Sequence, residues 1–252
     1  MILGIFDSGL GGLTVLKEIL KNNIYEKIVY YGDTLRLPYG EKDKDTLLEL
    51  TKNDIEFLLK KGAEEIVMAC GTVSTNVLDS IKDNYAFRII GIVDIACKEA
   101  AKITKNGKIG ILATPATVRT GEFTRKIKKI CGRNEVFEIP CQKLTPLIEG
   151  GKKDSLEMEE ALNEYLTILK EKNVDTIILG CTHYPIIADK IDLYFDGKVK
   201  LINCGELISN EINDGEYIKP KIEFYVSGNT EDFLKLAKNI INIEEINNVK
   251  NY

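Results

Sequence analysis

The chain has 252 residues, enough for one large domain or two small ones. Its net charge of −5 gives no excess of positive charge for binding nucleic acid. The apolar runs are too short to cross a bilayer, and the N-terminal residues do not resemble an export signal. We therefore expect a globular cytoplasmic protein with no nucleic-acid or membrane partner, whose six cysteines are reduced thiols.

Short apolar segments alternate with amphipathic segments along the chain. Each predicted strand is followed by a predicted helix, which favours an α/β fold with parallel sheets covered by helices on both faces. The longest predicted helix is residues 155–170, where apolar side chains recur at helical spacing. The predicted strands are residues 3–6, 26–32, 64–70, 108–114, 175–181 and 222–226. The region between Cys131 and Cys141 is predicted to be a short connection.

A weak internal repeat divides the chain into two similar halves. Gly4 in "LGIFDSG" corresponds to Gly110 in "IGILATP", and a later strand of each half ends in a cysteine, Cys70 or Cys181. The repeat predicts two pseudo-symmetric, doubly wound parallel-sheet domains: residues 1–93 plus 207–252, and residues 94–206. Ligands of open α/β sheets bind at the carboxyl ends of the strands. If the domains face each other, two thiols would flank one ligand in the cleft between them.

Three other segments place polar residues after predicted strands. Asp7 and Ser8 precede a glycine-rich turn that suits an anion at a helix N-terminus, although Asp7 could instead be a helix cap. Asp33 and Arg36 could pair locally in a segment that ends in the turn 38–40, which would need no function of its own. Hydroxyl groups follow Cys70, and their clustering favours a functional site over a cysteine that is only buried.

The sequence "IILGCTHYP" places Cys181 two residues before His183, the only histidine of the chain. Two ligands at this spacing are too few for a closed zinc site, so we expect no metal. Alternate residues of an extended strand point to opposite sides. A contact between this thiol and imidazole, which an acyl-transfer site would also need, therefore requires that the strand has already ended. A packing role is predicted for the four other cysteines, Cys97, Cys131, Cys141 and Cys204.

Six segments together resemble the bacterial glutamate racemases of the aspartate/glutamate racemase superfamily. The similarity extends from about Leu3 to Glu206, with a weaker match in "FYVSGNTEDF". "DSGLGG" and "GCTHYP" are specific only in combination. In chain order, the segments are "GIFDSGLGG", "YYGDTLRLPYG", "ACGTVSTN", "GILATPAT", "PLIEGG" and "LGCTHYP".

The resemblance implies a racemase without a cofactor, in which two cysteines act on opposite faces of the substrate Cα. Cys70 would serve D-glutamate and Cys181 would serve L-glutamate. The resemblance also assigns assisting roles to Asp7 and His183 and a supporting role to Glu149. It further implies a supply of D-glutamate for peptidoglycan, and a homodimer is the assembly we predict. The substrate-binding positions would be Asp7, Ser8, Tyr39, Gly40, Gly71, Thr72, Thr182 and His183.

One residue departs from the family pattern. The family usually has Asn after its first cysteine, whereas this chain has Gly71. The backbone N–H remains, but a side-chain hydrogen bond worth about 0.5–1.5 kcal/mol is lost. The departure predicts weaker binding or a shifted substrate preference.

Three alternatives remain open at this point. The chain could be a racemase or isomerase of another small acid such as aspartate, because Gly71 alters a substrate-binding position. It could be a regulatory binding protein that keeps the fold. It could also be a cysteine hydrolase, which would form a covalent acyl-enzyme and is distinguished by that species.

Overall fold

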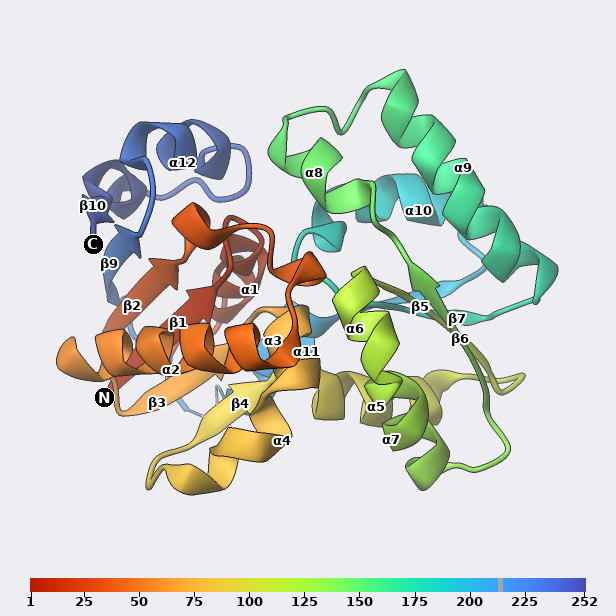
Figure 1. Ribbon diagram of the computed structural model, residues 1–252, viewed down its shortest axis with the longest axis horizontal. Coiled ribbons are helices and arrows are strands. Elements are labelled where there is room, and N and C mark those ends of the chain that lie inside the picture. Colours follow the sequence, from red (N-terminus) through yellow and green to blue (C-terminus); the bar gives the residue numbers. More distant parts are fainter. Residues whose placement is uncertain (213–214) are drawn as a thin grey trace.

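The computed structural model describes residues 1–212 and 215–252 and contains two parallel β-sheets (Figure 1). The first sheet has the strand order β10-β9-β2-β1-β3-β4, and the second has the order β6-β5-β7-β8. The first sheet comprises β1 (Ile2–Asp7), β2 (Lys27–Gly32), β3 (Glu65–Met68), β4 (Ile89–Gly91), β9 (Lys221–Val226) and β10 (Lys250–Asn251). The second comprises β5 (Lys108–Ala113), β6 (Glu135–Pro140), β7 (Thr176–Leu179) and β8 (Lys200–Asn203).

The strand orders confirm the internal repeat. The first four strands of each half lie in the same order, with the second strand beside the first and then the third and fourth. Gly4 aligns with neighbours on β2 and β3, and Gly110 aligns with neighbours on β6 and β7. A Cβ at Gly4 would lie 3.0 Å from Leu58, and one at Gly110 would lie 2.9 Å from Leu169. Each glycine therefore lets a helix pack closely on its sheet.

Helices cover both faces of each sheet, as the alternating sequence pattern predicts (Figure 1). The apolar stripe of the predicted helix 155–170 is buried in α9, and Ser155 caps that helix by accepting from the Met158 N–H. The helices are α1 (Gly12–Ile19), α2 (Lys44–Lys60), α3 (Gly71–Asn76), α4 (Leu78–Ile81), α5 (Ile92–Ile103), α6 (Pro115–Thr120), α7 (Glu122–Ile130), α8 (Leu144–Glu149), α9 (Leu156–Glu171), α10 (Ala188–Tyr194), α11 (Cys204–Ile212) and α12 (Thr230–Ala237).

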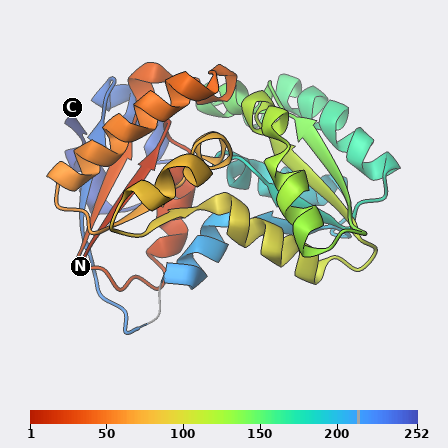
Figure 2. The ribbon, with the colours of Figure 1, turned by 60° about the horizontal axis from the view of Figure 1, so that its bottom comes forward.

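The two halves share packing where α5 and α11 lie together between the sheets (Figure 2). One hydrophobic cluster contains Leu3 and Val67 from the first sheet and Ile111 and Ile178 from the second. Strand β9 pairs with β2, so the first sheet combines segments from the two ends of the chain.

The domain boundaries at residues 93/94 and 206/207 stay a prediction.

One local prediction was wrong. The region between Cys131 and Cys141 contains β6, an edge strand whose partly exposed residues give no continuous apolar run. Helices α3 and α4 are separated at Val77, where φ is −123°. Within the described ranges, no helix is both long and apolar enough to cross a membrane.

Candidate active site

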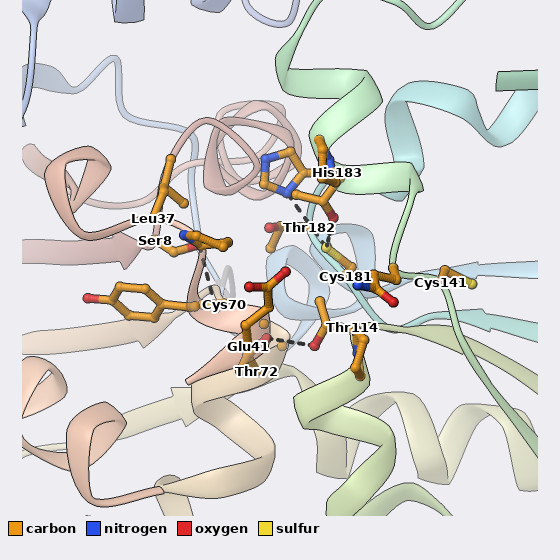
Figure 3. Close-up of a pocket in the computed structure, with 18 of the residues that line it drawn as sticks. Ser8, Leu37, Glu41, Cys70, Thr72, Thr114, Cys141, Cys181, Thr182 and His183 are labelled. Carbon is orange, nitrogen blue, oxygen red and sulfur yellow. Dashed lines mark hydrogen bonds between the residues drawn. The ribbon is translucent and has the colours of Figure 1, made fainter. Parts of the chain in front are cut away.

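The carboxyl ends of the central strands of the two sheets meet at a cavity of about 240 Å³. Figure 3 shows Cys70 and Cys181 on opposite walls of this cavity. The wall residues are Ser8, Leu37, Pro38, Tyr39, Gly40, Glu41, Cys70, Gly71, Thr72, Thr114, Pro115, Cys141, Gln142, Thr145, Pro146, Glu149, Cys181, Thr182 and His183. Of the site residues predicted from the sequence, all except Asp7 belong to this wall.

Cys70 lies between β3 and α3, where the chain leaves the first sheet. Its thiol is buried and donates to the Ser8 hydroxyl at an Sγ–Oγ distance of 3.9 Å. Burial, followed by the nearby Asp7 carboxylate, raises the pKa of Cys70 to about 12. The surroundings of Cys70 therefore favour the protonated thiol.

Cys181 has different neighbours. Strand β7 ends at Leu179, so the chain has left the extended conformation before Cys181. The Cys181 thiol can therefore contact the His183 imidazole. The Cys181 Sγ lies 3.6 Å from the His183 Nδ1 and 3.6 Å from the Thr145 hydroxyl. Both neighbours are hydrogen-bonding groups, and one of them can carry a positive charge.

His183 is fully buried between Cys181 and Glu149. Its Nε2 lies 2.9 Å from the Glu149 Oε1. Burial alone would lower the pKa of His183, but the hydrogen bonds and charges of Cys181 and Glu149 outweigh burial and raise it well above its usual value. These contacts favour the imidazolium, in which both ring nitrogens are donors.

Asp7 lies behind the cavity wall, at the end of β1, and is completely buried. Its carboxylate accepts from the Gly9 N–H at 3.0 Å and from the Thr182 hydroxyl at 3.1 Å. Burial raises the pKa of Asp7, although the charge of His183 and these hydrogen bonds act in the opposite direction. Asp7 thus links the strand end of the first half to the residue that follows Cys181.

Apart from His183, the cavity wall offers neutral hydroxyls rather than cations. Ser8, Thr72 and Thr182 face the cavity, and the Thr72 hydroxyl lies 2.9 Å from that of Thr114 on the other half (Figure 3). The charged or ionisable members of the wall, apart from its cysteines and Tyr39, are Glu41, Glu149 and His183. A bound carboxylate would therefore depend on hydroxyl and backbone donors and on His183 for stabilisation.

Tyr39 contributes its ring to the wall, but its hydroxyl is committed elsewhere. It donates to the Asp33 Oδ2 at 2.6 Å and lies 3.4 Å from the Asp54 Oδ2. The predicted pair of Asp33 with Arg36 is confirmed at 2.6 Å. This network holds the turn that carries Gly40 against the cavity.

Several wall residues were not predicted from the sequence. Thr114 follows β5, the strand equivalent to β1, so the repeat could have identified it as the counterpart of the Asp7–Ser8 turn. Thr145 and Gln142 come after β6, which the sequence did not reveal, and no local signal marks them. Cys141 has the predicted packing role but also lines the cavity, and its sulfur points away from the centre (Figure 3).

Comparisons with known proteins show the family to which the chain belongs. A family model described as Asp/Glu/hydantoin racemase matches residues 17–211. The glutamate racemase of Desulforudis audaxviator is 34% identical over 93% of this chain and 92% of that protein. The glutamate racemase of Listeria innocua is 33% identical over 97% of this chain and 95% of that protein.

Solved structures give the same result. A glutamate racemase isoform from Bacillus anthracis matches with a TM-score of 0.93 at 27% identity, covering 100% of this chain and 97% of that one. The Francisella tularensis glutamate racemase, solved in complex with D-glutamate, matches with a TM-score of 0.90 at 29% identity, over 99% and 96% of the chains. The chain therefore belongs to the Asp/Glu/hydantoin racemase family.

Proposed function

We propose that the chain is a glutamate racemase, which interconverts L- and D-glutamate by moving a proton on and off Cα. The observation that supports this most directly is the placement of Cys70 and Cys181 on opposite walls of one cavity. Inversion of a stereocentre requires removal of a proton from one face and delivery to the other. Two thiols on opposite walls provide one group for each face.

In the L-to-D direction, Cys181 acts as the base and Cys70 as the acid. The imidazolium of His183, 3.6 Å from the Cys181 sulfur, favours negative charge on that sulfur. The Cys181 thiolate takes the Cα proton, and the Cys70 thiol gives its proton to the opposite face. In the D-to-L direction the roles are exchanged, so the protonation of the two thiols is a property of the pair.

The transition state carries negative charge that spreads from Cα into the substrate carboxylate. Donors that are already oriented stabilise such charge without reorganising during the reaction. Ser8 and Thr72 face the cavity and provide these donors, whereas the Thr182 hydroxyl already donates to Asp7. Glu149 keeps His183 charged and oriented, and Asp7 orients Thr182 through a 3.1 Å hydrogen bond.

Turnover in D₂O tests this proposal. L-Glutamate incubated with the enzyme should become a mixture of enantiomers, and the D-glutamate formed should carry deuterium at Cα, as measured by chiral chromatography and mass spectrometry. Aspartate serves as the competing substrate. Inversion without deuterium at Cα would contradict proton transfer through thiols, and faster turnover of aspartate would contradict the assigned substrate.

The wider setting is part of the same proposal. The six cysteines are free thiols, which suits a reducing cytoplasm. There the enzyme would supply D-glutamate for peptidoglycan and act as a homodimer. Light scattering across a range of protein concentrations tests the assembly, and a monomer at every concentration would contradict it.

A further inference from the structure

Three glycines of the first half touch the second half across the cleft. A Cβ at Gly71 would lie 2.1 Å from the carbonyl oxygen of Gly180, and one at Gly11 would lie 2.2 Å from the Thr182 hydroxyl oxygen. A Cβ at Gly40 would lie 2.9 Å from the Thr114 Cβ. No real Cβ makes contacts this short, so a side chain at any of these positions would require a shift.

The glycines are needed for space and not for backbone conformation. Gly11 has φ −57° and ψ −37°, and Gly71 is the first residue of helix α3. Neither they nor Gly40 is among the glycines with positive φ. Because any L-residue could adopt these conformations, the requirement at all three positions is the close approach of the two halves.

The close approach at Gly71 involves the residues next to the two cysteines. Gly71 directly follows Cys70, and Gly180 directly precedes Cys181. The atom that blocks a Cβ at Gly71 is a backbone oxygen, which cannot rotate away as the end of a side chain could. The residues next to the two cysteines therefore meet backbone to backbone, and this contact sets how closely the two thiols can approach each other.

We infer that Gly71 is a positioning residue, whose missing side chain sets the separation of the Cys70 and Cys181 sulfurs. This inference rests on the proposed racemisation. Replacement by Asn would not simply restore an amide donor, because the new Cβ would first push the two halves apart. Inversion needs both sulfurs within reach of one Cα, so it is sensitive to that displacement.

A substrate analogue separates the positioning role from general damage. Removal of the Cα proton of β-chloroglutamate by one thiolate lets the electron pair form a Cα=Cβ double bond while chloride leaves. The resulting enamine is hydrolysed to 2-oxoglutarate and ammonium. This elimination needs only one cysteine, whereas racemisation needs two.

The test compares Gly71→Ala with the parent enzyme in both reactions. We expect the kcat of glutamate racemisation to fall about tenfold or more beyond any fall in elimination, since a displacement of about 1 Å can cost 10²-fold. Gly132→Ala is the matched control, because Gly132 is exposed and its Cβ would meet only the Lys128 carbonyl oxygen at 3.8 Å. If Gly71→Ala does not fold, Gly40→Ala gives the same comparison with a smaller displacement.

The outcomes are distinct. Equal losses of racemisation and elimination, or parental rates of both, would overturn the positioning role while leaving the proposed function intact. A parent enzyme that does not racemise glutamate would instead overturn the proposed function.

Discussion

The two cysteine sites are equivalent in topology but opposite in their chemical surroundings. Each cysteine follows the third strand of its half. Cys70 contacts a neutral hydroxyl and has a carboxylate nearby, and its pKa is raised to about 12. Cys181 contacts the His183 imidazole, whose charge is supported by Glu149. The two halves thus share the position of the thiol but differ in its neighbours, which are a hydroxyl and a carboxyl group at Cys70 and an imidazole at Cys181.

This asymmetry cannot make the enzyme faster in one direction at low substrate. Two enantiomers have equal free energies in water, so the equilibrium constant of racemisation is 1. The values of kcat/KM for L- and D-glutamate must therefore be equal at any pH. The difference between the two sites can appear only in kcat and KM separately, or in a reaction that uses one site.

The largest effect is expected from removing either thiol. Cys70→Ala and Cys181→Ala should each reduce racemisation by at least about 10³-fold, because one face of Cα loses its acid or base. Cys70→Ala should still eliminate chloride from β-chloro-L-glutamate, and Cys181→Ala should do so from the D-enantiomer. Chloride release measures both. A parental rate of racemisation in either variant would rule out the two-base mechanism.

A smaller effect is expected from the partners of Cys181. His183→Asn should reduce kcat/KM about 10²-fold, equally for both enantiomers. In the elimination reaction it should slow the L-analogue much more than the D-analogue, because His183 contacts only Cys181 among the two thiols. Equal slowing of both analogues would mean that His183 supports the whole cavity and not one thiol.

The pH dependence of kcat/KM in Glu149→Gln tests how Glu149 affects the charge of His183. Glu149 raises the pKa of His183, so replacing the carboxylate with a neutral amide should lower that pKa. The imidazolium would then be lost at a lower pH, and the alkaline fall in kcat/KM should move to lower pH. The pH profiles of the variant and parent measure this shift, and coincident alkaline limbs would show that Glu149 does not control the charge of His183.

The smallest effect is expected on the reactivity of the Cys70 thiol when Asp7 is replaced. Asp7→Asn removes a charge that raises the pKa of Cys70, so alkylation of Cys70 by iodoacetamide at mildly alkaline pH should become several-fold faster. Burial is the larger cause and remains, which keeps the change modest. Peptide mapping measures the rate, with alkylation of Cys181 as the internal reference. Slower alkylation of Cys70 in the variant would contradict the assigned influence of Asp7.

The sequence predicted those parts of the site that follow a strong local pattern. Buried strands followed closely by Cys70 and Cys181, and the matching glycines Gly4 and Gly110, identified two similar halves and the thiol of each. Thr145 was not predicted, because it follows an edge strand with partly exposed residues. The contact of Gly71 with Gly180 could not be predicted either, since it depends on how two halves distant in sequence approach each other.

The hydrophobic cluster that spans both sheets has a consequence for unfolding. Because α5 and α11 pack with residues of both halves, separating the halves would expose apolar surface that neither can cover alone. The two halves should therefore not unfold independently, and we expect a single cooperative unfolding transition on heating. Two resolved peaks in a calorimetric scan would show instead that each half retains a stability of its own.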